Sequence, residues 1–557
     1  MSPSRPSSKQ SSVRQFPPEK PTPTQAVEDE YEDAEKNYQP KSIKFWIIMI
    51  SNYLATFLVA LDRTIIATAI PKITDEFNSI EDIAWYGSAY MLAAACLFPI
   101  AGRIYQLYST KWVFLAFLVI FEIGSALCGA APSSVAFIVG RAIAGLGSAG
   151  IFVGGMMIIL PIVPLRKRPL FTSLFGMSFG VASVAGPLLG GAFTDKLTWR
   201  WCFYINLPIG GFTIAAIVLL LHIPSPKHEK LTALAIVKKL DPIGILFFVP
   251  SMVCLILALQ WGGSTYSWSS PKIIGLFVAF GVLLVLFIVV EVLTPETAMI
   301  PTRVVLNRSV AGAMLFMLLL SGGLFSIVYY LTTWFQAAKG VSAIHSGIDT
   351  LPTLLSMIIL SIPNAIITQK TGYYVPSLLI TPVFSATGAG LLSTLTPSSS
   401  SGKWIGYQIL YGCGLATGFQ TSTLAPQTVL PRADVAIGMA MMFFMQQLGG
   451  AIFLSVSQNV FSTKLVHLLS GVAGLDAEVI VNTGATDLRK VVPQSELSTV
   501  VNAYSYSLTR VFIMAAALNA IMILGALAVE WKNIKGEKVS EDQAKSGDKA
   551  EQGESKI

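Results

Sequence analysis

The chain has 557 residues, of which 53% are hydrophobic and only 12% carry a charged side chain. A soluble domain has roughly 25% charged residues, and much of its surface must face water. The composition therefore excludes an ordinary soluble protein and predicts an integral membrane protein in contact with the lipid bilayer. The net charge of +7 is spread over the loops, so it does not indicate nucleic-acid binding.

Polar tails flank the apolar part of the chain. Residues 1–44 include a Ser/Pro-rich stretch and an acidic run, and residues 532–557 alternate Lys with Asp and Glu. Such segments cannot bury enough apolar surface to fold, so both tails are predicted to be disordered. The first apolar segment begins near Phe45, behind the acidic tail, and is therefore not predicted to be a cleavable signal peptide.

A helix that crosses the hydrocarbon of a bilayer needs roughly 20 largely apolar residues. Such segments lie at 45–69, 83–105, 111–130, 135–160, 169–193, 201–223, 241–262, 271–293, 309–335, 347–367, 376–396, 404–424, 434–457 and 510–531. The sequence thus predicts an all-α membrane protein with fourteen transmembrane helices.

An even number of spans places both tails on the same side of the membrane. Thirteen Lys and Arg residues fall in short loops on the side of the tails, and six fall in short loops on the opposite side. The positive-inside rule therefore predicts that both tails are cytoplasmic. The long segment at about 458–508 is then predicted to be an extracellular loop.

A charged loop follows the sixth span and divides the chain. We predict a six-helix bundle at 45–223, a cytoplasmic loop with two linker helices at 224–308, and a second six-helix bundle at 309–531. Two six-helix halves around a central site form a known architecture of secondary transporters. The 6+2+6 arrangement therefore predicts a transporter.

Two charged residues lie side by side within the first span. A charge at the middle of the bilayer costs at least about 2.5–3.5 kcal/mol, so Asp62 and Arg63 must face protein or water. They could form a local ion pair. Alternatively, Asp62 lines a cavity and binds a proton, because burial disfavours its charged form while a nearby cation favours it.

Two further charged residues lie within later spans. Arg141 in the fourth span can act only as a fixed positive charge, either by bonding backbone carbonyls or by modulating a proton carrier such as Asp62. Glu122 in the third span is another candidate for proton coupling, with helix packing as the alternative. Glycines beside Arg141 allow a neighbouring helix to approach closely.

The fifth span contains Gly186, Pro187, Gly190 and Gly191. Small residues at this spacing permit close helix contact, and proline interrupts the helical hydrogen-bond ladder. The segment is predicted either to kink as a gate or to serve packing alone.

Other polar residues within the spans are candidates for lining a substrate cavity. They are Tyr90, Asn206, Tyr330, Asn364, Gln446 and Gln447. The scattered cysteines and histidines do not indicate a metal site, and no cofactor is expected. The sequence also has no nucleotide-binding loop and no nucleophile–base arrangement, so we predict that the protein is not an enzyme.

Four runs of the sequence resemble motifs of the major facilitator superfamily, in its 14-span drug:proton antiporter branch. They are Leu61-Asp62-Arg63-Thr64-Ile65-Ile66 through Pro71, Arg141-x-x-x-Gly145-x-Gly147, Gly186-Pro187-x-x-Gly190-Gly191, and the run from Trp199 to Gly210. The resemblance extends from Phe45 to Trp531. It implies proton transfer for the second motif and antiport for the third.

One loop departs from the superfamily pattern. Between spans 2 and 3 the family usually has an aspartate, and this chain has Gln106 there, with Ser109 in place of a glycine. The charged latch attributed to that loop is therefore in question, although Arg103 and Lys111 are present.

The resemblance to fungal members implies a monomeric exporter of a hydrophobic or amphipathic organic compound in the plasma membrane, driven by protons. Uptake on the same scaffold, for example of a siderophore, is the alternative function, and the vacuolar membrane is the alternative location.

Overall fold

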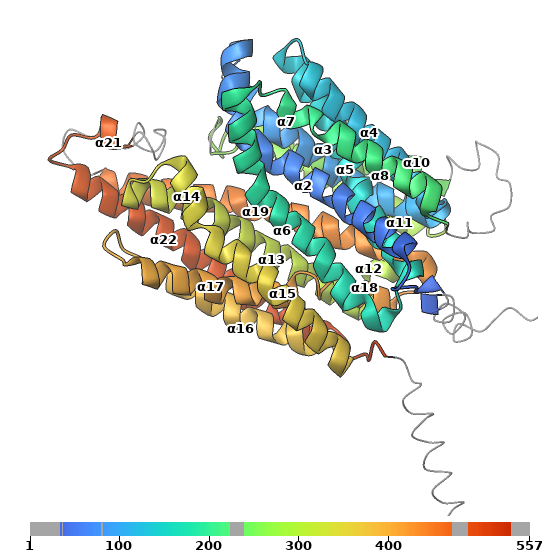
Figure 1. Ribbon diagram of the computed structural model, residues 1–557. Helices are drawn as coiled ribbons and strands as arrows, with labels where there is room; N and C mark the ends of the chain where they lie inside the picture. The colour runs from blue at the N-terminus through green and yellow to red at the C-terminus, as the bar shows by residue number, and fades with distance from the viewer. Residues whose placement is uncertain are drawn as a thin grey trace, which may run out of the picture.

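The computed structural model describes residues 34–35, 37–79, 82–222, 239–263, 265–470 and 488–535. Most of both predicted tails, most of the charged loop after span 6, and residues 471–487 lie outside this part. Every regular element of the described residues is a helix (Figure 1), which confirms the all-α fold class.

The first bundle contains the helices that precede the charged loop. They are α2 (Ile43–Phe77), α3 (Ile83–Leu107), α4 (Thr110–Ala130), α5 (Ser134–Ile162), the short turn η2 (Leu165–Lys167), α6 (Arg168–Lys196), α7 (Trp201–Tyr204) and α8 (Asn206–Leu220). Helix α5 packs on α3 and α4, while α2 packs on α6 and α8. Helix α5 is the most buried of these helices.

Two linker helices follow, α10 (Pro242–Trp261) and α11 (Pro271–Leu293), and they pack against each other. Only 11% of the most apolar window of α11 is buried inside the protein. A helix with so large an exposed apolar surface needs lipid to cover it.

The second bundle contains the remaining helices. They are α12 (Thr302–Val305), α13 (Arg308–Trp334), the π-helical turn η3 (Phe335–Lys339), α14 (Ala343–Asp349), α15 (Leu351–Thr371), α16 (Val375–Leu392), α17 (Ser401–Gly418), α18 (Leu424–Val429), α19 (Arg432–Leu469), α21 (Leu488–Val491), α22 (Leu497–Ile521) and α23 (Ile523–Ala528). Helix α13 packs on α19 and α22, and α16 packs on α17 and α22.

Thirteen helices of the described part are long and apolar enough to cross a bilayer. The exception among the fourteen predicted spans is α17, which covers most of segment 404–424 but is not among the thirteen. Lys403, Gln408 and several glycines lower its hydropathy, although α17 packs against α15 and α16 like its neighbours. The predicted count of fourteen is therefore not confirmed.

The segment predicted as a long loop at 458–508 is helical at both ends. Helix α19 continues to Leu469, and α22 begins at Leu497. The sequence prediction ended the first helix early because polar residues such as Gln458 and Lys464 interrupt the apolar pattern. Both residues lie within α19, after its most apolar stretch.

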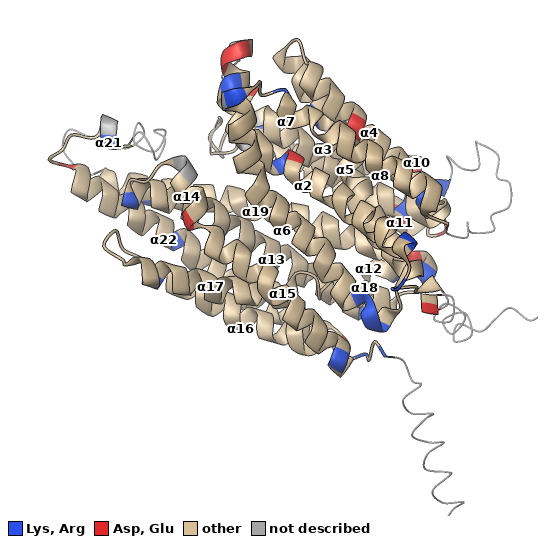
Figure 2. Cartoon of the chain, viewed as in Figure 1, with Lys and Arg blue, Asp and Glu red and all other residues tan. Residues whose placement is uncertain are grey.

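We call the end of the molecule where α2 begins the tail end, and the opposite end the far end. Charged residues gather at the helix ends and are few along the middles of the helices (Figure 2). This distribution is the one expected for helices that cross a hydrocarbon layer, because charges are costly there.

The two bundles contact each other near the tail end. Phe443 of α19 stacks on Phe98 of α3 with ring centroids 5.9 Å apart, and a Cβ on Gly102 would lie only 2.6 Å from the Cβ of Ala440. On the other side of the interface, Ile358 of α15 lies against Gly180 of α6.

The same helix faces are open toward the far end. Gly87 lies eleven residues before Phe98 and Gly191 eleven residues after Gly180, so each shares a face with its partner about three turns away. Among the described residues, nothing lies within 4 Å of a Cβ built on Gly87 or Gly191. The bundles therefore diverge toward the far end, where the ends carrying α7 and α14 lie apart in Figure 1.

Candidate functional site

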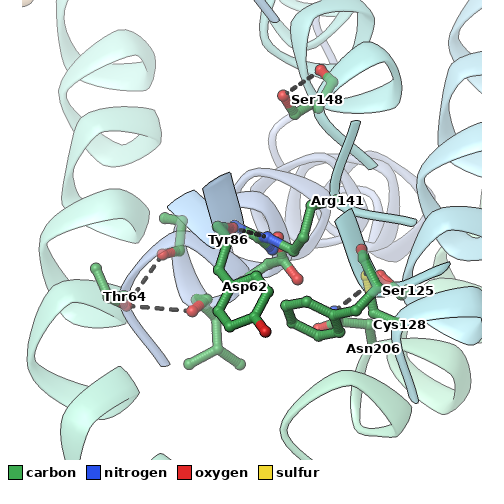
Figure 3. A network of polar contacts seen from close by, with 12 residues as sticks. Asp62, Thr64, Tyr86, Ser125, Cys128, Arg141, Ser148 and Asn206 are labelled. Carbon is green, nitrogen blue, oxygen red and sulfur yellow. Dashed lines mark hydrogen bonds and ion pairs between the residues drawn. The ribbon is translucent and has the colours of Figure 1, made fainter. Parts of the chain in front are cut away.

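A buried ion pair connects two helices of the first bundle. Asp62 of α2 and Arg141 of α5 lie with Oδ2 and Nη1 2.6 Å apart, and both side chains are buried (Figure 3). Arg141 is thus the ion-pair partner of Asp62, and Arg63 is not. The structure brings together the two residues singled out in separate spans 79 positions apart.

Arg141 is held by three kinds of contact. Its Nε donates to the backbone carbonyl of Tyr86 at 2.8 Å, in addition to its bond with Asp62. Its guanidinium also lies 4.6 Å from the centre of the Tyr90 ring, a cation–π contact. Arg141 therefore bonds a backbone carbonyl and pairs with Asp62 at the same time.

The glycines next to Arg141 determine how closely α5 can approach its neighbours. A Cβ on Gly145 would lie 2.3 Å from the carbonyl oxygen of Tyr90 on α3, and one on Gly147 would lie 2.5 Å from the backbone nitrogen of Phe121 on α4. Any larger residue would push α5 away from α3 or α4. The glycines therefore set the close packing that places Arg141 beside Asp62.

One oxygen of the Asp62 carboxylate is available for chemistry. Oδ2 is bonded to Arg141, whereas Oδ1 is buried and has no hydrogen-bond partner among the described residues. Within the described part of the chain, the carboxylate is therefore bonded through one oxygen only.

Glu122 is also buried, on α4 against α8. Neither carboxylate oxygen has a hydrogen-bond partner in the described part of the chain, and a Cβ on Gly210 would lie 1.7 Å from Oε1. Close by, Asn206 of α8 donates to Ser125 Oγ of α4 at 3.0 Å (Figure 3). An isolated buried carboxylate is costly when charged, so a neutral Glu122 fits this position.

The glycine motif of α6 serves helix packing at two of its positions. A Cβ on Gly186 would lie 2.1 Å from Thr64 Oγ1, and one on Gly190 would lie 2.2 Å from Thr68 Oγ1, both on α2. Gly191 faces open space, and α6 continues past Pro187 as one helix. The contacts of Gly186 and Gly190 with α2 are those expected of the packing alternative.

Of the candidates for lining a cavity, three bond within their own bundle. Asn206 bonds Ser125, Tyr330 of α13 donates to Gln458 Oε1 at 2.7 Å, and Asn364 of α15 donates to Thr421 Oγ1 at 3.1 Å. Their polar groups join neighbouring helices, which is a packing role. Tyr90 is buried beside Arg141 and belongs to the ion-pair site.

The remaining candidates, Gln446 and Gln447, lie where the bundles begin to diverge. Gln447 is one turn beyond Phe443 along α19 and about 40° around the helix, on the face toward the first bundle. Gln446 is half-buried, and Gln447 is 9% exposed. Gln447 therefore lies on the face of α19 that meets the first bundle at Phe443, and Gln446 lies beside it.

A second polar cluster joins the two bundles at the tail end. Gln106 of α3 donates to Asp434 Oδ1 of α19 at 2.9 Å and is itself bonded by Arg103. Arg303 of α12 binds both oxygens of Asp434, at 2.9 and 3.0 Å. The hydrogen bond to Asp434 raises the pKa of Arg303 above its usual value, so the guanidinium stays charged.

Gln106 stands where the family usually has an aspartate, and the tail-end cluster shows which residue provides a carboxylate here. The carboxylate is supplied by Asp434 on the opposite bundle, three residues into α19, where an acidic side chain also stabilises the helix N-terminus. The sequence analysis missed Asp434 and Arg303 because charges near helix ends usually need no partner. Gln106 was the signal, since an amide can bond a carboxylate that an aspartate would repel.

The chain matches a family model described as Major Facilitator Superfamily over residues 53–454. It is 49% identical over 516 residues to "MFS-type efflux pump MFS1" of Arthroderma benhamiae, covering 92% of this chain and 96% of that protein. It is also 48% identical over 507 residues to "Efflux pump aflT" of Aspergillus parasiticus, covering 90% and 99% of the two chains.

Solved structures of the superfamily share the fold. The human organic anion transporter MFSD10 aligns with a TM-score of 0.56 at 14% identity, covering 85% of this chain and 99% of that one. The transporter FucP in the outward conformation aligns with a TM-score of 0.52 at 13% identity, covering 88% and 100%. The chain therefore belongs to the major facilitator superfamily, related to fungal efflux pumps, and is a membrane transporter and not an enzyme.

Proposed function

We propose that the protein exports a hydrophobic or amphipathic organic compound in exchange for protons, by alternating access. The observation that carries the proposal is the buried Asp62–Arg141 pair, which joins α2 to α5 and leaves Asp62 Oδ1 without a hydrogen-bond donor. A titratable carboxylate inside the membrane is a functional candidate by default. The relatives named efflux pumps support the direction of transport.

Protonation of Asp62 is the switching step in this proposal. The proton removes the negative charge that Arg141 binds, and Arg141 keeps its own charge. The attraction between α2 and α5 then falls, and the tight glycine contacts transmit any movement of α5 to α3 and α4. Release of the proton on the other side restores the pair and resets the transporter.

Alternating access requires one state that is open at the far end and another that is open at the tail end. In the present conformation the bundles meet at the tail end and diverge at the far end. The excess of basic residues in the loops of the tail end supports a cytoplasmic location for the tails, so the opening would face outward. Opening the tail-end cluster around Asp434 would expose the cavity to the cytoplasm.

We further propose that the chain works as a monomer in the plasma membrane. Each six-helix half contributes one wall of the opening, so a single chain provides the whole pathway. Glu122 is proposed as a second proton-binding group, because it is buried without a donor in the described part of the chain.

The proposal is tested by expressing the protein in a pump-deficient yeast and measuring retention of a panel of amphipathic dyes. Cells with the protein should retain less of at least one dye, and a protonophore should abolish the difference. Protonophore-sensitive accumulation in place of export would support the uptake alternative. Export that persists without a proton gradient would contradict antiport.

A further inference from the structure

Arg63 is a cation in the membrane-spanning part of α2, and none of the described carboxylates forms an ion pair with it. Its side chain is half-buried, and its guanidinium lies 5.6 Å from the centre of the Tyr90 ring. In the described part of the chain no carboxylate lies within ion-pairing distance of Arg63. The adjacent Asp62 is bound to Arg141 on a different face of the helix.

The contacts of its neighbours show which way Arg63 points. Thr64 Oγ1 donates to the carbonyl of Ala182 on α6 at 3.2 Å, and Arg63 contacts Tyr90 on α3. Arg63 is about 100° from both Asp62 and Thr64 around the helix. It therefore lies on the side of α2 between α3 and α6.

That side of α2 is turned toward the second bundle. Helices α3 and α6 are the helices of the first bundle that pack most against the second, on α19 and α15 respectively. The surface between them must consequently face the space between the bundles and not lipid. A half-buried guanidinium is compatible with this position, because water in the opening can solvate it.

The position along the helices places Arg63 in the open part of that space. Tyr90 is eight residues, about two turns, beyond Phe98 in the direction of the far end. Phe98 marks the level at which the bundles still touch, and Gly87, one turn beyond Tyr90, already faces open space. Arg63 therefore borders the opening just above its closed floor.

Charge at this level is positive overall. Asp62 and Arg141 neutralise each other, so the charge of Arg63 remains uncompensated. A guanidinium repels organic cations and donates strong hydrogen bonds to carbonyl, phenolate or carboxylate oxygens. The low-dielectric walls of a cavity focus the field of a charge, so the effect on a ligand is larger than at an open protein surface.

We propose that Arg63 is a specificity-determining substrate contact, which binds an oxygen acceptor of the transported compound and excludes organic cations. The inference rests on the proposed export function and narrows its substrate class to oxygen-rich compounds without positive charge. Arg141 cannot take this role, because its guanidinium is already bonded to Asp62 and to the Tyr86 carbonyl.

Two dyes with the same xanthene core test this proposal in pump-deficient yeast. Fluorescein, loaded as its diacetate, is an oxygen-rich acid, and rhodamine 6G is a cation. The wild-type protein should export fluorescein and not rhodamine 6G. R63Q should lower the rate of fluorescein export at least about tenfold, whereas R63K should retain more of it because the charge remains.

Matched controls separate recognition from folding. K272Q removes a charge that lies against Tyr266 between the linker helices, and its fluorescein export should equal wild type. R63Q should reach the membrane at wild-type levels and should export rhodamine 6G faster than wild type does. A gain of this kind cannot come from misfolding.

Three results would overturn the inference. They are export of rhodamine 6G by the wild type at the rate of fluorescein, export of neither dye, and a rate for fluorescein in R63Q equal to that of wild type. Protonophore-sensitive export of rhodamine 6G alone would leave the proposed function intact while refuting the role of Arg63. If the protonophore leaves fluorescein export unchanged, antiport is refuted while the role of Arg63 as a substrate contact is not.

Discussion

At the scale of single residues, the site depends on one buried ion pair, between Asp62 and Arg141. Asp62 and Arg141 come from different helices, and their ion pair is surrounded by apolar side chains. Removing one partner of a buried pair leaves the other charge without compensation, which typically costs about 3–5 kcal/mol. Removing both charges is often far less costly.

This asymmetry gives a prediction for R141A. The single substitution should destabilise the protein by about 3 kcal/mol at neutral pH, because it leaves Asp62 charged and buried. The double variant D62N/R141A should recover most of that loss. Thermal unfolding in detergent at pH 7 checks both expectations, and equal stability of R141A and wild type would show that the pair is solvated.

The sequence identified these residues but not their geometry. A charge within an apolar span predicts that Asp62, Arg63, Glu122 and Arg141 must be accommodated inside protein or water. Which cation pairs with Asp62 depends on how α2 and α5 are rotated and packed. Local spacing leaves that open, and the glycine contacts of α5 decide it in favour of Arg141.

At the scale of helices, glycines determine where two backbones can approach each other. The motif of α6 combines two positions that touch α2 with one that faces open space. If the motif serves packing, a larger residue should impair the protein at the positions that touch α2 and not at the position that faces open space. If the whole segment tolerates no change, a larger residue should impair the protein at every position.

We therefore expect G186V and G191V to behave differently. A larger side chain at Gly186 meets Thr64 and the backbone of Ile65, so G186V should lower transport by tenfold or more and destabilise the protein by roughly 1–3 kcal/mol. The transport rate of G191V should stay within twofold of that of wild type. Efflux rates at matched expression test this, and equal losses in both variants would refute the packing account.

The helix boundaries show what apolar pattern alone can predict. The positions of most spans follow from hydropathy, but α19 and α22 continue into polar sequence that the pattern assigned to a loop. Likewise α17 is a helix whose glycines, Lys403 and Gln408 reduce its apolar signal. Packing against neighbouring helices stabilises these helices, and the hydropathy of a segment contains no information about such packing.

The tail-end cluster is a latch between helices of the two bundles. Asp434 is buried and receives bonds from Gln106 on one bundle and from Arg303 on the other, and Arg303 itself is well exposed. Of these bonds, the hydrogen bond from Gln106 to Asp434 is the one that crosses between the bundles. A single hydrogen bond contributes on the order of 1 kcal/mol, which corresponds to about a fivefold change in a two-state equilibrium.

Q106A should therefore shift the population toward closure of the far end by about fivefold, because it removes the hydrogen bond that joins α3 to Asp434. Spin labels on cysteines at Ile83 and Ile348, in a chain without native cysteines, would report this as more short distances between α3 and α14. R166Q is the control, because Arg166 pairs with Glu35 at the tail end without joining the bundles. An unchanged distance distribution in Q106A would show that the latch has no effect on the equilibrium between the two states.

At the scale of the whole molecule, the structure represents one of the states that a transporter must visit. The sequence predicts two bundles, but two bundles can pack with either end open, and only tertiary contacts distinguish these states. Here aromatic and glycine contacts close the tail end, and the ion-pair site lies between that closed floor and the open far end.

The central claim is that substrate leaves in exchange for a proton carried by Asp62. The most direct measurement uses purified protein in liposomes that contain a pH-sensitive dye and a compound found to be exported in cells. Under an imposed pH gradient, wild-type protein should move compound and protons in opposite directions at a fixed ratio, and D62N should lose proton movement while remaining folded. Proton flux in D62N equal to wild type, or compound and protons moving in the same direction, would contradict the account.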